Sequence, residues 1–276
     1  MNRIARKVSI ASLAALLLSP VTSTFGATTI VDNFGDGGWQ NSDTRDSTTA
    51  NVGPAGRVDL DVTAPAPGPS GYNALRLTTV TGNDKATIAQ TGINLGSIAN
   101  FSGSFSWYKE QTGAAAPALK IGIDTTDANV ASSRPDESNW DKFLIYEPYD
   151  NPDSADPGTG TWVTQTFSLN SGGWWLRDRN SGTNVSAPPN GKTLQQWLSD
   201  PTYGALLTNA SIVGVQIGTG SGNANLTGYV DTLSYTYGES STSETYYFGN
   251  AVPEPTGIAL LGLGAGALLL RRRRTA

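Results

Sequence analysis

Apolar residues recur at every second position through most of this chain, and this alternation constrains the fold more than any other feature. In segment 100–109, Phe101, Phe105 and Trp107 fall on one face and three serines fall on the other. Successive side chains of a strand point to opposite sides of a sheet, so this period indicates strands with one buried face. The same alternation appears in segments 57–63, 74–80, 119–123, 143–145, 163–169, 213–217 and 229–237.

Clusters of glycine, proline and asparagine separate these runs, and only segment 194–199 has the pattern of a helix. Thr193 followed by Gln196 resembles a capping box, and Pro201 would end that helix. About ten short strands and almost no helix predict an all-β fold, an antiparallel β-sandwich of jelly-roll type.

We expect one sandwich domain over residues 27–238, followed by a polar linker at 239–251. The linker is expected because serine, threonine and glutamate dominate its first half. Turn-rich stretches at 111–118 and 149–161 are expected to be loops.

The chain contains no cysteine and no histidine. Disulfides, thiol catalysis, Ser-His-Asp systems and zinc sites built on histidine or thiolate are therefore excluded. Three basic residues lie in the first seven positions and four near the C-terminus, which leaves 11 basic residues against 23 acidic ones. Such an acidic body disfavours nucleic acid and anionic lipid as partners.

The N-terminus has the order of a secretory signal peptide. Residues 1–7 carry three basic side chains, residues 8–18 are mostly apolar, and small residues follow Pro20. Cleavage after Gly26 places small side chains at the positions that require them, so we expect residues 1–26 to be removed. No cysteine follows the signal, which excludes a lipid-modified N-terminus.

The last 25 residues form a second sorting element. Pro253, Glu254 and Pro255 precede an uncharged apolar segment at 257–270, and Arg271, Arg272, Arg273 and Arg274 follow it. A helix over that segment would reach roughly 21 Å, which is shorter than the ~30 Å hydrocarbon core of a bilayer. Thinning of the bilayer or snorkelling of the arginines would make up the difference. The arginines resist translocation, so they should stay cytoplasmic.

This tail, residues 252–276, resembles the PEP-CTERM sorting signal of exported proteins in Gram-negative bacteria. The resemblance implies an exosortase-type processing enzyme as partner, a transient inner-membrane intermediate, and delivery to the cell surface or the extracellular matrix. An ordinary tail anchor or a buried core helix is the alternative, but a core helix would not end in four arginines.

The two ends of the body carry a second resemblance. Segments 31–39 and 228–233 are similar to the first and closing strands of jelly-roll carbohydrate-binding modules. The likeness implies that a first strand near Ile30 pairs with a closing strand at 229–237. It also implies that Asp32, Asp36 and Asp231 hold a structural calcium ion, although aspartate is common in turns without metal.

Seven tryptophans provide the remaining clue to function. Trp140, Tyr149, Trp174 and Trp175 are candidate ligand-binding residues because exposed aromatic faces stack on sugar rings. The alternative is that each tryptophan fills the core, as the strand pattern predicts for Trp107.

The sequence therefore favours an exported surface or matrix protein whose sandwich binds polysaccharide. A non-binding structural surface protein is the alternative. A glycoside hydrolase, which needs two carboxylates, is a further one, but Glu110, Glu137 and Glu147 form no paired pattern. We expect no catalytic residues.

Overall fold

A computed structural model of the chain describes residues 26–45, 56–112, 115–125, 139–148, 151, 159–187, 189–220 and 224–252. Residues 1–25, Tyr149, the sorting motif Pro253–Pro255, the apolar segment 257–270 and the arginines at 271–274 lie outside this part of the chain. Within the described part, none of the helices has the length and apolarity needed to span a bilayer.

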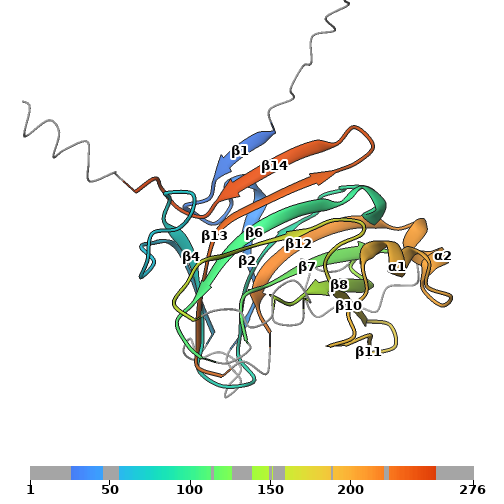
Figure 1. Ribbon diagram of the computed structural model, residues 1–276, viewed down its shortest axis with the longest axis horizontal. Coiled ribbons are helices and arrows are strands. Elements are labelled where there is room, and N and C mark those ends of the chain that lie inside the picture. The colour runs from blue at the N-terminus through green and yellow to red at the C-terminus, as the bar shows by residue number, and fades with distance from the viewer. Residues whose placement is uncertain are drawn as a thin grey trace, which may run out of the picture.

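The described residues form a β-sandwich of two seven-stranded sheets (Figure 1). Sheet A consists of β1 (Ala27–Ile30), β14 (Thr242–Tyr247), β13 (Leu226–Tyr237), β4 (Ala74–Thr79), β3 (Gly56–Val62), β6 (Ser102–Lys109) and β9 (Val163–Phe167). Sheet B consists, in spatial order, of β11 (Thr183–Val185), β10 (Trp174–Asp178), β8 (Lys142–Tyr146), β7 (Ala118–Asp124), β12 (Ser211–Thr219), β5 (Lys85–Thr91) and β2 (Trp39–Arg45).

Most neighbouring strands are antiparallel, and the long strand β13 organises sheet A. One of its edges pairs with β4 in the first half and with β14 in the second half, and its other edge pairs with β6. The exception to the antiparallel pattern is β1, which runs parallel to β14. The all-β sandwich expected from the alternation is thus confirmed.

The inner faces of both sheets form one hydrophobic core. Phe105 and Trp107 of β6 are buried, as their register in the sequence predicted. They lie opposite residues of sheet B such as Ile121, Leu144 and Ile217, which are also completely buried. Burial of alternate side chains from two facing sheets accounts for the period of two in the sequence.

Short helices complete the fold: η1 (Asp36–Gly38), η2 (Ile98–Asn100), α1 (Leu194–Leu198) and α2 (Gly204–Thr208). The capping box of α1 is confirmed, because the Thr193 hydroxyl accepts from the Gln196 N–H and the Gln196 side chain accepts from the Thr193 N–H. Helix α2 was not predicted. Its N-cap, Tyr203, makes no side-chain capping bond, but the Asp200 carboxylate, three residues earlier, accepts from the Thr202 and Tyr203 N–H groups at 2.9 and 3.0 Å.

The stretch 239–251 was expected to be a polar linker, and this expectation is wrong. It contains the strand β14. Tyr246 and Phe248 are buried and pack edge-on against Trp39, with ring centroids 5.5 and 5.3 Å away. The serines and threonines that suggested a linker lie mainly on the opposite, more exposed face of β14 or in the turn before it.

The first strand and the expected closing strand share sheet A but do not pair. β14 lies between them, bonded to β1 in the register Ile30↔Tyr247 and to β13 in the register Thr232↔Tyr247. The expected pairing of a strand near Ile30 with 229–237 is therefore wrong by one strand. The reason is that the true last strand had been assigned to the linker.

Candidate functional site

Two of the four predicted ligand-binding aromatics have no exposed ring. Trp174 is completely buried in the core, where it packs against Tyr146 and Phe167. Trp140 is 1% exposed. A buried indole has no free face for a sugar, so neither residue can stack on a ligand and the prediction is wrong for both.

Trp140 is buried although it precedes β8 and lies on the outer face of sheet B. The strands beneath it carry Gly122 and Gly214, and a β-carbon at either position would overlap the indole ring. Ala89, Val213 and Phe143 complete this small outer cluster. The absence of side chains at the two glycines creates the space that the indole fills.

Trp175 remains as a candidate, because it is only half-buried. It follows the buried Trp174 on β10, so its side chain points away from the core toward the outer face of sheet B. Strand register places it beside Ile145 of β8, and beyond Ile145 lies Lys120 of β7. Strands lie roughly 4.8 Å apart, so the Cα atoms of Trp175 and Lys120 are about 10 Å from each other.

Two further half-buried residues adjoin Trp175 on this face. Arg177 lies two positions along β10, and its register partner on β8 is Phe143. The Arg177 guanidinium donates to the carbonyl of Gly182 and, at 2.8 Å, to the side-chain oxygen of Asn184. Among the described residues, no carboxylate pairs with it. We call Trp175, Arg177, Phe143 and Lys120 the β10 face.

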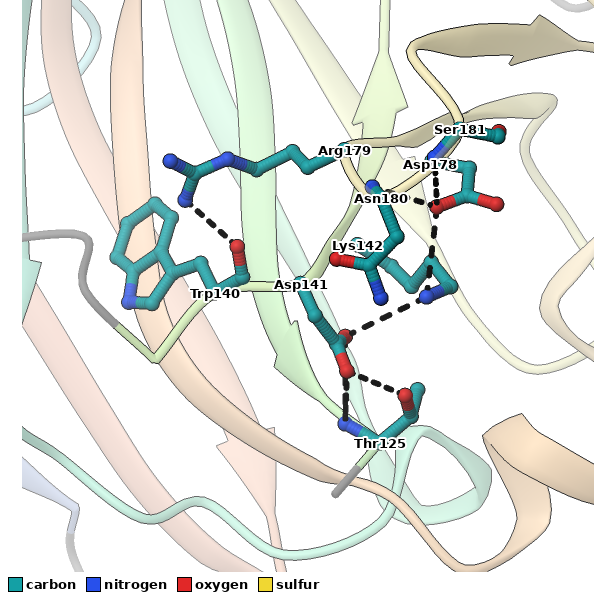
Figure 2. A network of polar contacts seen from close by, with 8 residues as sticks. All are labelled: Thr125, Trp140, Asp141, Lys142, Asp178, Arg179, Asn180 and Ser181. Atoms are coloured by element: carbon teal, nitrogen blue, oxygen red, sulfur yellow. Dashed lines mark hydrogen bonds and ion pairs between the residues drawn. The ribbon is translucent and has the colours of Figure 1, made fainter. Parts of the chain in front are cut away.

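A polar network beside the β10 face holds both ends of the β7–β8 connection (Figure 2). Asp141 accepts from the backbone N–H of Thr125 at 3.2 Å and from its hydroxyl. Arg179 donates to the carbonyl of Trp140 at 2.6 Å, and its guanidinium lies 5.5 Å from the ring centre of Phe143. The end of β7 and the start of β8 are thereby fixed to each other and to the turn after β10.

Lys142 lies at the centre of this network and is 2% exposed. Its ammonium is 3.9 Å from Asp141 and 3.4 Å from Asp178. Burial raises the pKa of Asp141, an effect that Thr125 and Lys142 reduce without reversing. Burial also acts to raise the pKa of Asp178, but hydrogen bonds from Ser181 and the charge of Lys142 lower it overall. Asp141 and Asp178 together compensate the buried charge of Lys142, since an unpaired buried cation would strongly destabilise the fold.

The three aspartates predicted to bind calcium are not assembled into one site. Asp32 and Asp36 lie in the turn after β1, where Asn33 donates to both carboxylates at 2.9 Å. Asp231 instead binds Ser70. Among the residues that the structure describes, no group of three or more carboxylate, histidine or cysteine side chains is arranged to hold a metal ion.

A β-bulge explains the position of Asp231. The register of β13 against β6 shifts between Val230 and Thr232, so the side-chain alternation changes sides at this point. Asp231 is completely buried and accepts from the backbone N–H of Ser70 at 2.9 Å and from the Ser70 hydroxyl. It therefore fastens the β3–β4 connection to sheet A. The sequence carries no local signal for this bulge.

Sequence reasoning also missed Asp61, which binds the end of the described chain. Its carboxylate accepts from the Asn250 N–H at 2.7 Å and from the Asn73 amide at 2.9 Å. Burial acts to raise the pKa of Asp61, but these hydrogen bonds lower it overall. Asp61 has a positive φ of 55° inside β3, a position where aspartate is tolerated better than most residues. No sequence motif marks it.

The carboxylates considered for a hydrolase do not come together. Glu110 follows β6 in sheet A and accepts from the Tyr229 hydroxyl at 2.6 Å. Glu147 follows β8 in sheet B, and Glu137 lies outside the described residues. No contact links Glu110 with Glu147 in the described part of the chain.

Comparison with known proteins adds little to this description. No protein-family model matches the sequence, and no curated protein matches it. One similar solved structure is a crystal structure of domains CD of another protein, at 14% identity and a TM-score of 0.32; the match covers 72% of this chain and 63% of that one. Another is lectin II from Ulex europaeus, at 16% identity and a TM-score of 0.30, covering 75% of this chain and 98% of the lectin. This chain thus spans less than two thirds of the first structure, and likeness at this level identifies no ligand.

Proposed function

We propose that this is an exported protein of the cell surface or extracellular matrix whose jelly-roll β-sandwich binds polysaccharide through the β10 face. The observation that carries the binding proposal is Trp175, a partly exposed aromatic on the outer face of sheet B that lies near the side chains of Arg177 and Lys120. Sugar recognition needs this combination, since the ring stacks on the aromatic and polar side chains bond the hydroxyls.

Export is proposed from the two sequence elements at the ends of the chain. Cleavage after Gly26 would begin the mature protein at Ala27, the first residue of β1. The tail from Pro253 would hold the protein in the inner membrane until an exosortase-type enzyme processes it. N-terminal sequencing of the exported form and deletion of 253–276 test this part. An unchanged location after the deletion would overturn it.

Affinity electrophoresis in gels containing extracellular polysaccharide tests the binding part. Stacking on one ring contributes about 0.5–1.5 kcal/mol, so Trp175→Ala should weaken retention about two- to tenfold. Trp175→Phe keeps an aromatic face and should retain most of the binding.

Trp162→Ala is the matched control. Trp162 is also half-buried, but it packs against Tyr108 and donates its indole N–H to the Ala66 carbonyl at 2.9 Å. Its removal should lower the melting temperature without changing retention. If Trp175→Ala and Trp162→Ala behave alike on every polysaccharide tried, the β10 face is not a binding site. The structural surface protein is then the better interpretation.

A further inference from the structure

Large apolar side chains exposed on the described surface are concentrated at one corner of the sandwich. Ile30, Phe34 and Val252 are 42%, 48% and 43% exposed. Only one other large apolar residue in the described part of the chain is comparably exposed, namely Val80 at 52%. Single exposed apolar residues are ordinary, but several at one place mark an interaction surface.

Strand pairing and hydrogen bonds bring the segments that carry these three residues to the same end of sheet A. Ile30 is the register partner of Tyr247 at the parallel ends of β1 and β14, which run side by side in Figure 1. The backbone N–H of Val252 donates to the carbonyl of Gly71 at 2.9 Å. Phe34 is in the turn after β1, and the Asn250 amide binds this turn through Asp32 at 3.1 Å.

Two tyrosines lie between these apolar residues. The rings of Tyr72 and Tyr247 stack at 4.4 Å with an interplanar angle of 9°, and both are half-buried. Neither hydroxyl has a hydrogen-bond partner among the described residues. Tyrosines with an apolar ring and a solvated hydroxyl are typical of the membrane–water interface. We call Ile30, Phe34, Val252, Tyr72 and Tyr247 the exit corner.

The position of the exit corner on the chain indicates its occupant. The apolar segment begins at residue 257, five positions after Val252. A chain extends at most ~3.6 Å per residue, so residue 257 lies within roughly 18 Å of Val252. The headgroup layer is about 5–8 Å thick on each side of a bilayer. With the tail inserted, so short a connection would keep the sandwich close to the bilayer, and the exit corner, which contains Val252, would be the part next to it.

We propose that, while the tail is inserted, the exit corner rests on the outer surface of the lipid bilayer with Phe34 among the headgroups. This proposal rests on the proposed insertion of the tail. The short tether makes even a weak contact effective, because it keeps the local concentration of bilayer surface high. Asp32 and Asp36 lie in the same turn as Phe34, so the contact should favour zwitterionic over anionic lipid.

A cysteine-free chain allows a clean test with a single labelled cysteine. The full mature chain carrying Phe34→Cys, labelled with an environment-sensitive fluorophore, is reconstituted into phosphatidylcholine vesicles. Val80→Cys is the matched control, since Val80 is equally exposed but lies at the far end of β4 from Tyr72. Val252 is too close to the tail to be informative.

The proposal expects a blue shift and strong quenching by brominated lipid for the Phe34→Cys variant, and quenching by aqueous iodide alone for Val80→Cys. Replacing half of the lipid with phosphatidylglycerol should reduce the quenching at Phe34→Cys. Equal lipid quenching at both positions would overturn the proposal, and so would iodide quenching at both. Quenching of Phe34→Cys by neither agent would show that protein covers the corner, which would also overturn it.

Flotation of the vesicles separates this failure from that of the premise. A chain that does not float with the vesicles lacks an inserted tail, so the proposed membrane insertion and the proposed corner contact are then both wrong. A chain that floats while Phe34→Cys stays in water refutes the corner contact alone. Polysaccharide binding at the β10 face is untouched by either result.

Discussion

The indole of Trp140 occupies the space that a β-carbon would take at Gly214. Gly122, its neighbour across the β7–β12 pair, has the same relationship to the ring. The two glycines therefore serve as a socket for one tryptophan on the outside of sheet B.

Replacing Gly214 with alanine should destabilise the protein, because the methyl group would displace the indole. Overpacking of this kind costs about 1–3 kcal/mol. Gly220→Ala is the control, since no atom of the described residues lies within 4 Å of a β-carbon at that position. Urea unfolding of both variants measures the difference. The combination of Gly214→Ala with Trp140→Ala should cost less than the sum of the single changes, and strict additivity would contradict the socket.

Removal of β14 should abolish cooperative folding. A chain ending after Gly238 loses Tyr246 and Phe248 from around Trp39, and each large core aromatic is worth about 3–5 kcal/mol against a total stability of ~5–15 kcal/mol. A chain ending after Val252 keeps all of β14 and should melt as the complete sandwich does. Calorimetry of the two truncations decides the matter. Equal melting curves would show that 239–252 is dispensable.

Asp231 should give the protein an unusual dependence on pH. Burial raises the pKa of Asp231 above its usual 3.8, although the hydrogen bonds from Ser70 and Thr232 oppose the shift. The folded state then binds this proton more tightly than the unfolded state. Its contribution to stability is therefore largest at low pH and declines as pH rises from 3.8 through the raised pKa.

Comparison with Asp231→Asn isolates this effect, since Asp61, Asp178 and Asp200 have lowered pKa values and change stability in the opposite direction. The unfolding free energy of the natural protein minus that of the variant should fall as the pH rises above 3.8. A difference that stays constant as the pH rises from 3.8 to neutrality would refute the prediction. Asp231→Ala, which leaves Ser70 without its acceptor, should cost about 1–3 kcal/mol at low pH, where the contribution of Asp231 is largest, and less as the pH rises.

The capping box of α1 predicts a smaller loss. Thr193→Ala removes the acceptor of the Gln196 N–H, at 3.2 Å, and should cost about 1 kcal/mol, or roughly 2–4 °C in melting temperature. Thr202→Ala, at an exposed position nearby, should change stability by less than about 0.5 kcal/mol. Similar melting temperatures for the two variants would show that the cap contributes nothing.

Local patterns predicted the elements of this fold better than they predicted the contacts between those elements. The alternation around Phe105 and Trp107 identified β6, because burial of one sheet face imposes it directly. The capping box identified α1 because all its atoms lie within four residues. The strand β14 was missed because only Tyr246 and Phe248 face the core, and polar residues dominate the remainder.

The candidate site depended on information that the sequence does not carry locally. Neighbouring side chains of a strand point to opposite faces, so one of Trp174 and Trp175 had to face outward. The alternation alone does not say which of the two does so. Trp140 is buried because two glycines from distant strands lie beneath it. The direction of Asp231 depends on a bulge between Val230 and Thr232, which alternation along the sequence does not reveal.

The parallel pairing of β1 with β14 has a consequence for how the chain acquires its structure. The first strand of the domain has its hydrogen-bonding partner among the last residues, Glu244 to Tyr247. A chain that emerges from its N-terminus, whether from a ribosome or through a membrane channel, presents β1 long before that partner exists. Sheet A stays incomplete until almost the whole domain has emerged, so final closure is a late event that depends on a contact across more than 200 residues. Such long-range closure is slow, because the entropy lost on closing so large a loop is recovered only when the last strand pairs.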